Sequence, residues 1–257
     1  MEILEKKDKA KYLIKSFDNE QYAFSFLKKG EMYFNCPTYY RYLGYCEDIE
    51  DLNKDHDDAN LAVAKSKSIG DICESTIGGC VGVYNNLPVY CMYTVGEKDT
   101  KKNLIGVRKE AFEGFKRSKH CCFVICEIAP FFNRIKEVFK DQFWADYISY
   151  CGETLESVMD FLKHNAEVIF RKSLCYAHQQ EYRVVLRDDK INARIYGSEN
   201  SCKICLADGT PYRGIIKRIG DISSFSKIVP YEALTLSDEK YYYFDLNKDY
   251  EVINNGK

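Results

Sequence analysis

The stretch HQQEYRVVLR occupies residues 178–187, and the fold that we expect is built around it. Aromatic and β-branched residues follow Glu181, which is typical of a strand that begins at this glutamate. Because side chains alternate between the two faces of a strand, Gln179 and Glu181 are expected to share a face, and Arg183 extends it. The sequence therefore predicts a strand whose first polar side chains lie on one face of a sheet.

The Gln179-x-Glu181 pattern supports two interpretations. A carboxylate can stabilise positive charge that grows on an anomeric carbon, and a neighbouring amide can hold a sugar hydroxyl. In that interpretation Glu181 and Gln179 are catalytic and line a surface cleft, where substitution changes stability little. In the other, Glu181 is a surface residue that pairs with Arg183 or Arg171.

The N-terminal residues predict a strand, a helix and a second strand. Residues 12–17 (YLIKSF) favour a strand, and Asp18 is a candidate N-cap for the helix that follows. Apolar residues then recur at helical spacing until Gly30, which is a typical C-terminal stop. Residues 32–35 (MYFN) favour the next strand.

The rest of the chain is rich in strand patterns, with four helical ones. We expect further strands at 87–95, 121–128, 145–150, 214–218 and 241–244, and helices at 110–117, 130–140, 154–162 and 222–228. No internal repeat or linker interrupts these patterns. The sequence therefore predicts a single α+β domain over residues 1–257, with an ordered core of about 10–250 and mainly antiparallel sheet.

Composition narrows the functional classes. The 37 basic and 39 acidic residues give a net charge of −2 over 257 residues, which argues against nucleic-acid binding driven by bulk charge. No run approaches the roughly 18 apolar residues of a membrane helix, and the polar N-terminus is unlike a secretory signal, so we expect a cytoplasmic protein away from membranes. The 12 cysteines are scattered, which favours buried reduced thiols over a metal site.

Several catalytic signatures are missing from the sequence. Neither G-x-G-x-x-G nor the P-loop pattern occurs, which argues against kinases, P-loop NTPases and classical dehydrogenases. The absence of G-x-S-x-G argues against a standard serine hydrolase.

Three blocks carry a resemblance to known proteins: residues 12–41, 89–92, and 170–173 together with 178–183. They resemble an uncharacterised bacterial and phage family of unknown function. The layout is also similar to that of the ADP-ribosyltransferase superfamily, in which a late strand begins with the catalytic glutamate. This resemblance implies a split antiparallel sheet with flanking helices.

The resemblance also implies a substrate and roles for particular residues. It implies that NAD is bound as a substrate, and that Glu181 acts as the catalytic residue with Gln179 beside it. The residues expected to bind NAD are Lys15, Ser16, Asn35, Thr38, Tyr39 and Arg183. The first strand of that superfamily usually offers Arg or His, whereas Lys15 can contact a phosphate only as a point charge.

Two functions follow from the resemblance. The first is transfer of ADP-ribose from NAD to an acceptor such as a protein, or hydrolysis of NAD, in bacterial or phage defence or counter-defence. The second is an inactive module of the same fold that binds a nucleotide or a partner protein. Lys15 and Glu181 around one cleft would favour catalysis, whereas Glu181 locked by Arg171 or Arg183 in a closed core would favour the binding module. In either case the strand at 12–17 should lie close to the strand that begins at Glu181.

Overall fold

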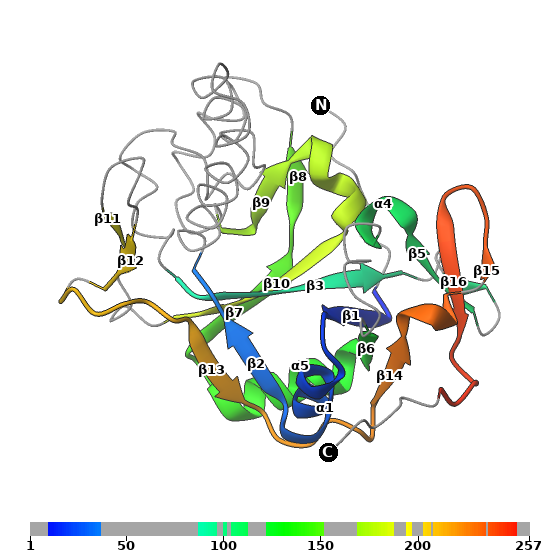
Figure 1. Cartoon of the computed structure of the whole chain (residues 1–257), viewed down its shortest axis with the longest axis horizontal. Helices are drawn as coiled ribbons and strands as arrows, with labels where there is room; N and C mark the ends of the chain where they lie inside the picture. The colour runs from blue at the N-terminus through cyan, green and yellow to red at the C-terminus, as the bar shows by residue number, and fades with distance from the viewer. Residues whose placement is uncertain are drawn as a thin grey trace.

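A six-stranded antiparallel sheet forms the centre of the molecule (Figure 1). The computed structural model describes residues 10–36, 87–96, 100–101, 104–112, 122–151, 169–187, 194–196, 203–206, 208–234 and 236–250. In spatial order the strands of this sheet are β14 (Ser226–Pro230), β6 (Cys122–Glu127), β1 (Tyr12–Phe17), β3 (Val89–Val95), β10 (Glu181–Leu186) and β7 (Phe143–Tyr147). Every pairing within it is antiparallel, which confirms the predicted α+β class with mainly antiparallel sheet.

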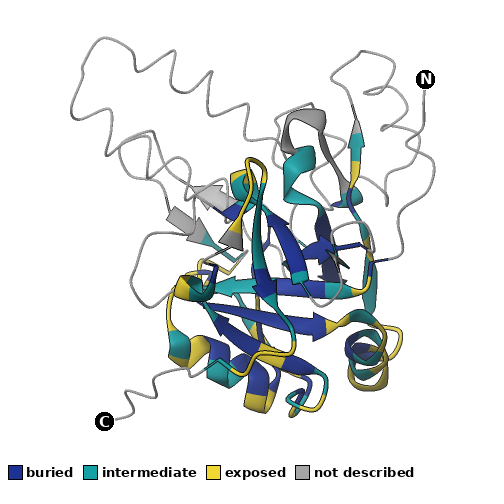
Figure 2. Cartoon of the chain, turned by 90° about the vertical axis from the view of Figure 1, so that its right-hand side faces the viewer, coloured by how far each residue is buried: buried dark blue, intermediate teal, exposed yellow. Residues whose placement is uncertain are grey.

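Two helices cover one face of this sheet. They are α1 (Glu20–Lys29) and α5 (Ile128–Phe139), and both lie below the sheet in the view of Figure 1. The apolar side of α1 meets that of α5 in the main core, where the rings of Phe26 and Phe131 lie 6.2 Å apart. Figure 2 shows buried residues along the central strands and exposed residues at the turns and outer helix surfaces.

Helix α1 begins and ends at capping residues. Asn19, and not the predicted Asp18, is the N-cap, since its side chain accepts a hydrogen bond of 2.7 Å from the backbone N–H of Gln21. Gly30 ends the helix as predicted, in the left-handed conformation with φ of 59°. A Cβ at this glycine would come within 2.5 Å of the Gly220 carbonyl oxygen, so the turn also requires its small size.

A second sheet covers part of the opposite face. Its strands are β15 (Leu236–Ser237), β16 (Tyr241–Asp245), β5 (Leu104–Arg108) and β4 (Thr100–Lys101), and the short helix α4 (Lys109–Phe112) follows β5. A separate apolar cluster fills the space between the sheets, with Ile14, Tyr93 and Phe123 from the central sheet and Ile105 and Phe244 from the other.

Three two-stranded sheets and two short 3-10 helices complete the described fold. They are β2 (Glu31–Phe34) with β13 (Ile215–Arg218), β8 (Ser149–Cys151) with β9 (Arg171–Ser173), β11 (Arg194–Tyr196) with β12 (Lys203–Cys205), η5 (Leu174–Gln179) and η6 (Tyr231–Ala233). Only the pairing of β8 with β9 is parallel among the described strands.

Two of the predicted elements differ from the structure. The helix predicted at 222–228 is wrong: this segment is a turn followed by β14, which pairs with β6 and in which only Lys227 is exposed. The helix predicted at 154–162 lies outside the described residues. The strand predicted at 145–150 is two strands, because β7 ends at Tyr147 and β8 begins at Ser149 in another sheet. Between them the backbone N–H of Ile148 donates to the Glu181 carbonyl oxygen over 2.9 Å.

Candidate functional site

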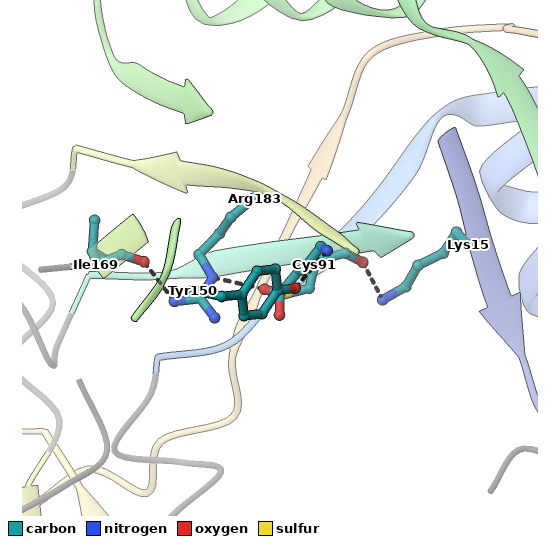
Figure 3. A network of polar contacts seen from close by, with 6 residues as sticks. Lys15, Cys91, Tyr150, Ile169 and Arg183 are labelled. Atoms are coloured by element: carbon teal, nitrogen blue, oxygen red, sulfur yellow. Dashed lines mark hydrogen bonds and ion pairs between the residues drawn. The ribbon is translucent and has the colours of Figure 1, made fainter. Parts of the chain in front are cut away.

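The carboxylate of Glu181 is bound to a buried arginine on its own strand. Arg183 Nε donates to Glu181 Oε1 over 2.8 Å, and Arg183 Nη1 donates to the Ile169 carbonyl oxygen over 2.6 Å (Figure 3). Glu181 is 7% exposed and Arg183 is 2% exposed, so the pair lies in the interior. Of the two partners that the sequence left open, Arg183 therefore holds the carboxylate; the side chain of Arg171 lies outside the described residues.

The pair lies on the face of the sheet that also carries Cys91 and Tyr93. In the antiparallel register Glu181 is opposite Tyr93, and Arg183 is opposite Cys91. Opposite residues of an antiparallel pair project to the same side of the sheet. Glu181, Arg183, Cys91 and Tyr93 therefore form one row of side chains, which we call the β3–β10 face.

The residue before Glu181 fixes where β10 begins. Gln180 has a φ of 40°, which is uncommon for a residue with a side chain. Its carbonyl oxygen accepts hydrogen bonds from the backbone N–H of Thr94 at 2.8 Å and from the Thr94 hydroxyl at 2.6 Å, and its side-chain oxygen accepts one from the Tyr93 hydroxyl. The backbone N–H of Glu181 donates to the Tyr150 hydroxyl over 2.8 Å. None of these supporting residues stands out in the sequence, because each contact joins distant parts of the chain.

Gln179 does not share a strand with Glu181. It is the last residue of the 3-10 helix η5, and the positive φ of Gln180 separates the two. The period-two alternation that linked Gln179 with Glu181 therefore does not apply, and it is Gln180 that contacts the neighbouring strand β3.

Lys15 lies at the other edge of β3, on the sheet face that also carries Leu13 and Tyr90 and that is opposite to the β3–β10 face. Its ammonium donates to the Cys91 carbonyl oxygen over 2.9 Å (Figure 3). It also lies 4.6 Å from the centre of the Tyr90 ring. Burial lowers the pKa of Lys15 below its usual 10.5, and the negative charge of Glu181 opposes this shift. Since β1 and β10 both pair with β3, the prediction that these two strands lie close together is confirmed.

Lys15 lies where the edge of β3 changes its partner. Strand β1 pairs with β3 through Tyr12, Leu13 and Ile14. Farther along the same edge, the backbone of Val89 exchanges hydrogen bonds with Asn35 at 2.7 and 3.2 Å. The Lys15 ammonium occupies the interval between these two pairings.

Asn35 and Ser16 flank this interval. Asn35 is 5% exposed, and its side-chain oxygen has no hydrogen-bond partner within the described structure. A Cβ at Gly214 would come within 2.5 Å of that oxygen, so the glycine leaves room for the amide. Ser16 follows Lys15 on β1, where it pairs with Phe123 of β6. Thr38 and Tyr39 lie outside the described residues.

Cys91 is poorly suited to act as a nucleophile. Burial and the nearby Glu181 carboxylate raise the pKa of its thiol to about 12, although Arg183 and Lys15 oppose this shift. The thiolate is the reactive form of cysteine. The thiol at this position is therefore held in its unreactive form near neutral pH.

The described residues include neither a candidate metal site nor a membrane-spanning helix. No group of three or more His, Cys, Asp or Glu side chains there is placed to hold a metal ion. No helix in the same ranges is long and apolar enough to cross a membrane. Comparison with known proteins gives no match to a protein-family model, to a curated protein or to a solved structure.

Proposed function

We propose that the chain is a nucleotide-binding module of ADP-ribosyltransferase-like layout in which Glu181 has a structural role. The observation that carries this proposal is the buried contact of 2.8 Å between Glu181 and Arg183. A carboxylate that stabilises an oxocarbenium-like transition state must offer uncompensated negative charge to the anomeric carbon. Arg183 compensates that charge at hydrogen-bond distance.

The charges around β3 favour an anion over a developing cation. Glu181 carries one negative charge, while Arg183 and Lys15 carry one positive charge each when both are protonated. These three groups together are positive by one charge; Asp18 also acts on Lys15, but it is exposed and its charge is screened by solvent. A site with this balance stabilises a bound phosphate, and it disfavours positive charge on a sugar ring.

Lys15 is the residue that we assign to the phosphate groups of the nucleotide. An ammonium has three N–H donors, and among the described residues only the Cys91 carbonyl oxygen accepts one of them. The other donors are available to a ligand. Lys15 acts there as a point charge, without the bidentate geometry of arginine.

Catalysis is the second candidate, and one observation favours it. The strands that carry Lys15 and Glu181 both pair with β3, and the charge of Glu181 acts on the pKa of Lys15, so the two side chains lie within electrostatic reach of each other. In this function the bond between ribose C1 and the nicotinamide nitrogen breaks, and neutral nicotinamide leaves. Water or a protein acceptor forms the new bond to C1 and releases a proton. Arg183 would have to release Glu181 during the reaction. The setting in bacterial or phage defence or counter-defence rests on the sequence resemblance for both candidates.

Binding and nicotinamide release, measured on the same preparation, separate the two functions. We expect calorimetry to detect binding of ADP-ribose and NAD, with no release of nicotinamide from NAD. Lys15→Met should weaken binding by about 10- to 100-fold, the scale of one lost hydrogen bond to a charged group. Lys28→Met is the matched control, since Lys28 is an exposed lysine on α1.

Two results would contradict the proposed module. Steady release of nicotinamide that Glu181→Gln abolishes in a folded variant would establish catalysis instead. Failure of both nucleotides to bind, together with no release, would refute both candidates.

A further inference from the structure

Arg108 is a cation without a partner in the described part of the chain. It is the last residue of β5, and its Nε is buried with no hydrogen-bond acceptor. No described carboxylate forms an ion pair with it, and Glu110, two residues later, is exposed. A buried donor without an acceptor destabilises a fold, more so when it is charged. Such a group is retained at low cost only if something supplies the acceptor.

Tyr93 connects Arg108 with the candidate site. The backbone N–H of Arg108 donates to the Tyr93 hydroxyl over 3.2 Å, and the same hydroxyl donates to the side chain of Gln180. Tyr93 is opposite Glu181 in the sheet, so its ring projects from the β3–β10 face. Tyr93 therefore joins the backbone of Arg108 to the β3–β10 face.

The backbone around Arg108 is fixed on several sides. Arg108 is opposite Tyr241 on β16, and the next residue, Lys109, donates its backbone N–H to the Lys240 carbonyl oxygen over 2.9 Å. The ring of Phe112 on α4 packs edge-on against Tyr93, with 5.0 Å between the ring centres. Arg108 thus extends from a rigid junction, as a preorganised binding residue requires.

We propose that Arg108 anchors a phosphate group of the ligand, in an inference that rests on the proposed function for the nucleotide itself. The guanidinium is planar and can donate two parallel hydrogen bonds to phosphate oxygens. A bound phosphate supplies the acceptor that Arg108 lacks and offsets its charge. Lys109 adds a second positive charge next to it; its ammonium lies 5.1 Å from the centre of the Tyr242 ring.

The two neighbouring cations Arg108 and Lys109 favour a ligand that carries more than one negative charge, such as a diphosphate. Adenosine has the same base and sugar but no phosphate, so it should gain nothing from Arg108.

The test compares three probes on the full chain and its variants by calorimetry. The probes are inorganic pyrophosphate, ADP-ribose and adenosine. Arg108→Gln removes the charge, and Arg108→Lys keeps it without the guanidinium. The matched control is Arg213→Gln, which removes one positive charge from an exposed residue. Thermal unfolding without ligand shows whether each variant is folded.

We expect Arg108→Gln to weaken binding of pyrophosphate and ADP-ribose by about 10- to 100-fold, the scale of a lost charge-assisted contact. The affinity of Arg108→Lys for both probes should lie between that of Arg108→Gln and that of the unchanged chain. Arg213→Gln should bind both probes as the unchanged chain does. Without ligand, Arg108→Gln should unfold at the same or a higher temperature, because an unpaired buried donor is lost. An unfolded Arg108→Gln together with an unfolded Arg108→Lys would assign Arg108 to the fold and overturn the inference.

The outcomes also distinguish this inference from the proposed function. Binding of ADP-ribose that is unaffected by Arg108→Gln would overturn the inference and leave the nucleotide-binding module in place. Binding of pyrophosphate that depends on Arg108, without any binding of ADP-ribose or NAD, would support the anion site and contradict the nucleotide. Binding of none of the probes to the unchanged chain would contradict both.

Discussion

Arg183 Nε lies 2.8 Å from Glu181 Oε1, and the two side chains belong to the same strand, two residues apart. Both are buried, and Arg183 also donates to the Ile169 carbonyl oxygen. Removing two charges from water is unfavourable, and only good geometry with additional hydrogen bonds compensates for it. Because each charge in this pair depends on the other, the contact links the candidate site directly to the stability of the fold.

Glu181→Gln should destabilise the chain by about 3–5 kcal/mol, because the buried Arg183 then has no counter-charge. This replaces the expectation from sequence that a cleft residue changes stability little. Urea unfolding followed by circular dichroism measures the free energy of unfolding. The double variant Glu181→Gln with Arg183→Met should be less destabilised than the two single changes added together.

If the double variant loses as much free energy of unfolding as the two single variants added together, the two side chains are not coupled and each acts through other contacts. Glu31→Gln provides the control, since Glu31 pairs with the exposed Arg218. An exposed ion pair should contribute less than about 1 kcal/mol.

Patterns that depend on neighbours in sequence predicted most of the central sheet. The strands at 12–17, 89–95 and 122–127 carry dense β-forming residues, and Gly30 marks the end of α1 because its backbone conformation favours glycine. The segment at 222–228 could not be assigned in this way. Its strand exists because it pairs with β6, and no local pattern records that partner.

The site was predicted less completely than the fold. The strands that carry Lys15 and Glu181 lie close together as predicted, but alternation alone cannot detect the positive φ of Gln180, which removes Gln179 from the strand. The sequence left two arginines as possible partners of Glu181. The three apolar residues that follow Arg183 were the signal that this pair is buried. Arg108 was missed because its contact with Tyr93 joins two different sheets.

Gly214→Ala should be more destabilising than Gly209→Ala, although both glycines have a positive φ. The left-handed conformation costs a residue with a Cβ about 1–2 kcal/mol at either position. At Gly214 the new Cβ would also approach the Asn35 side-chain oxygen at 2.5 Å, whereas at Gly209 it would meet nothing within 4 Å. We expect Gly214→Ala to destabilise the chain by about 2–4 kcal/mol, measured by urea unfolding. Equal effects of the two changes would show that crowding at Asn35 is relieved at no cost.

Cys126 should resist alkylation in the folded chain. It is fully buried, and this burial raises the pKa of its thiol to about 12, against 9.0 for the usual value. Near pH 8 its thiolate fraction should therefore be lower by about 10³-fold, and iodoacetamide reacts with the thiolate. Peptide mapping by mass spectrometry follows each cysteine separately, with the half-buried Cys205 as the internal comparison. Native labelling of Cys126 as fast as that of Cys205 would contradict the buried thiol.

Lys15→Met should change how stability depends on pH in the alkaline range. Burial lowers the pKa of Lys15 in the folded chain, whereas the unfolded chain keeps a value near 10.5. Between these two values the unfolded chain binds more protons, so the contribution of Lys15 to the free energy of unfolding rises with pH. Below the folded pKa of Lys15 both states are protonated, and its unfavourable contribution to stability is constant.

Urea unfolding from about pH 8 to pH 10 should therefore show the unchanged chain gaining stability relative to Lys15→Met as pH rises. Cys91 and Cys126 act in the opposite direction, but with pKa values raised to about 12 both thiols stay protonated in the folded chain up to pH 10, so their contributions are common to both chains and cancel. Lys28→Met controls for the loss of one surface charge. Parallel curves for the unchanged chain and Lys15→Met would mean that the ammonium at β3 is as well solvated in the folded chain as in the unfolded one, and the assignment of Lys15 as a buried phosphate contact would lose its physical basis.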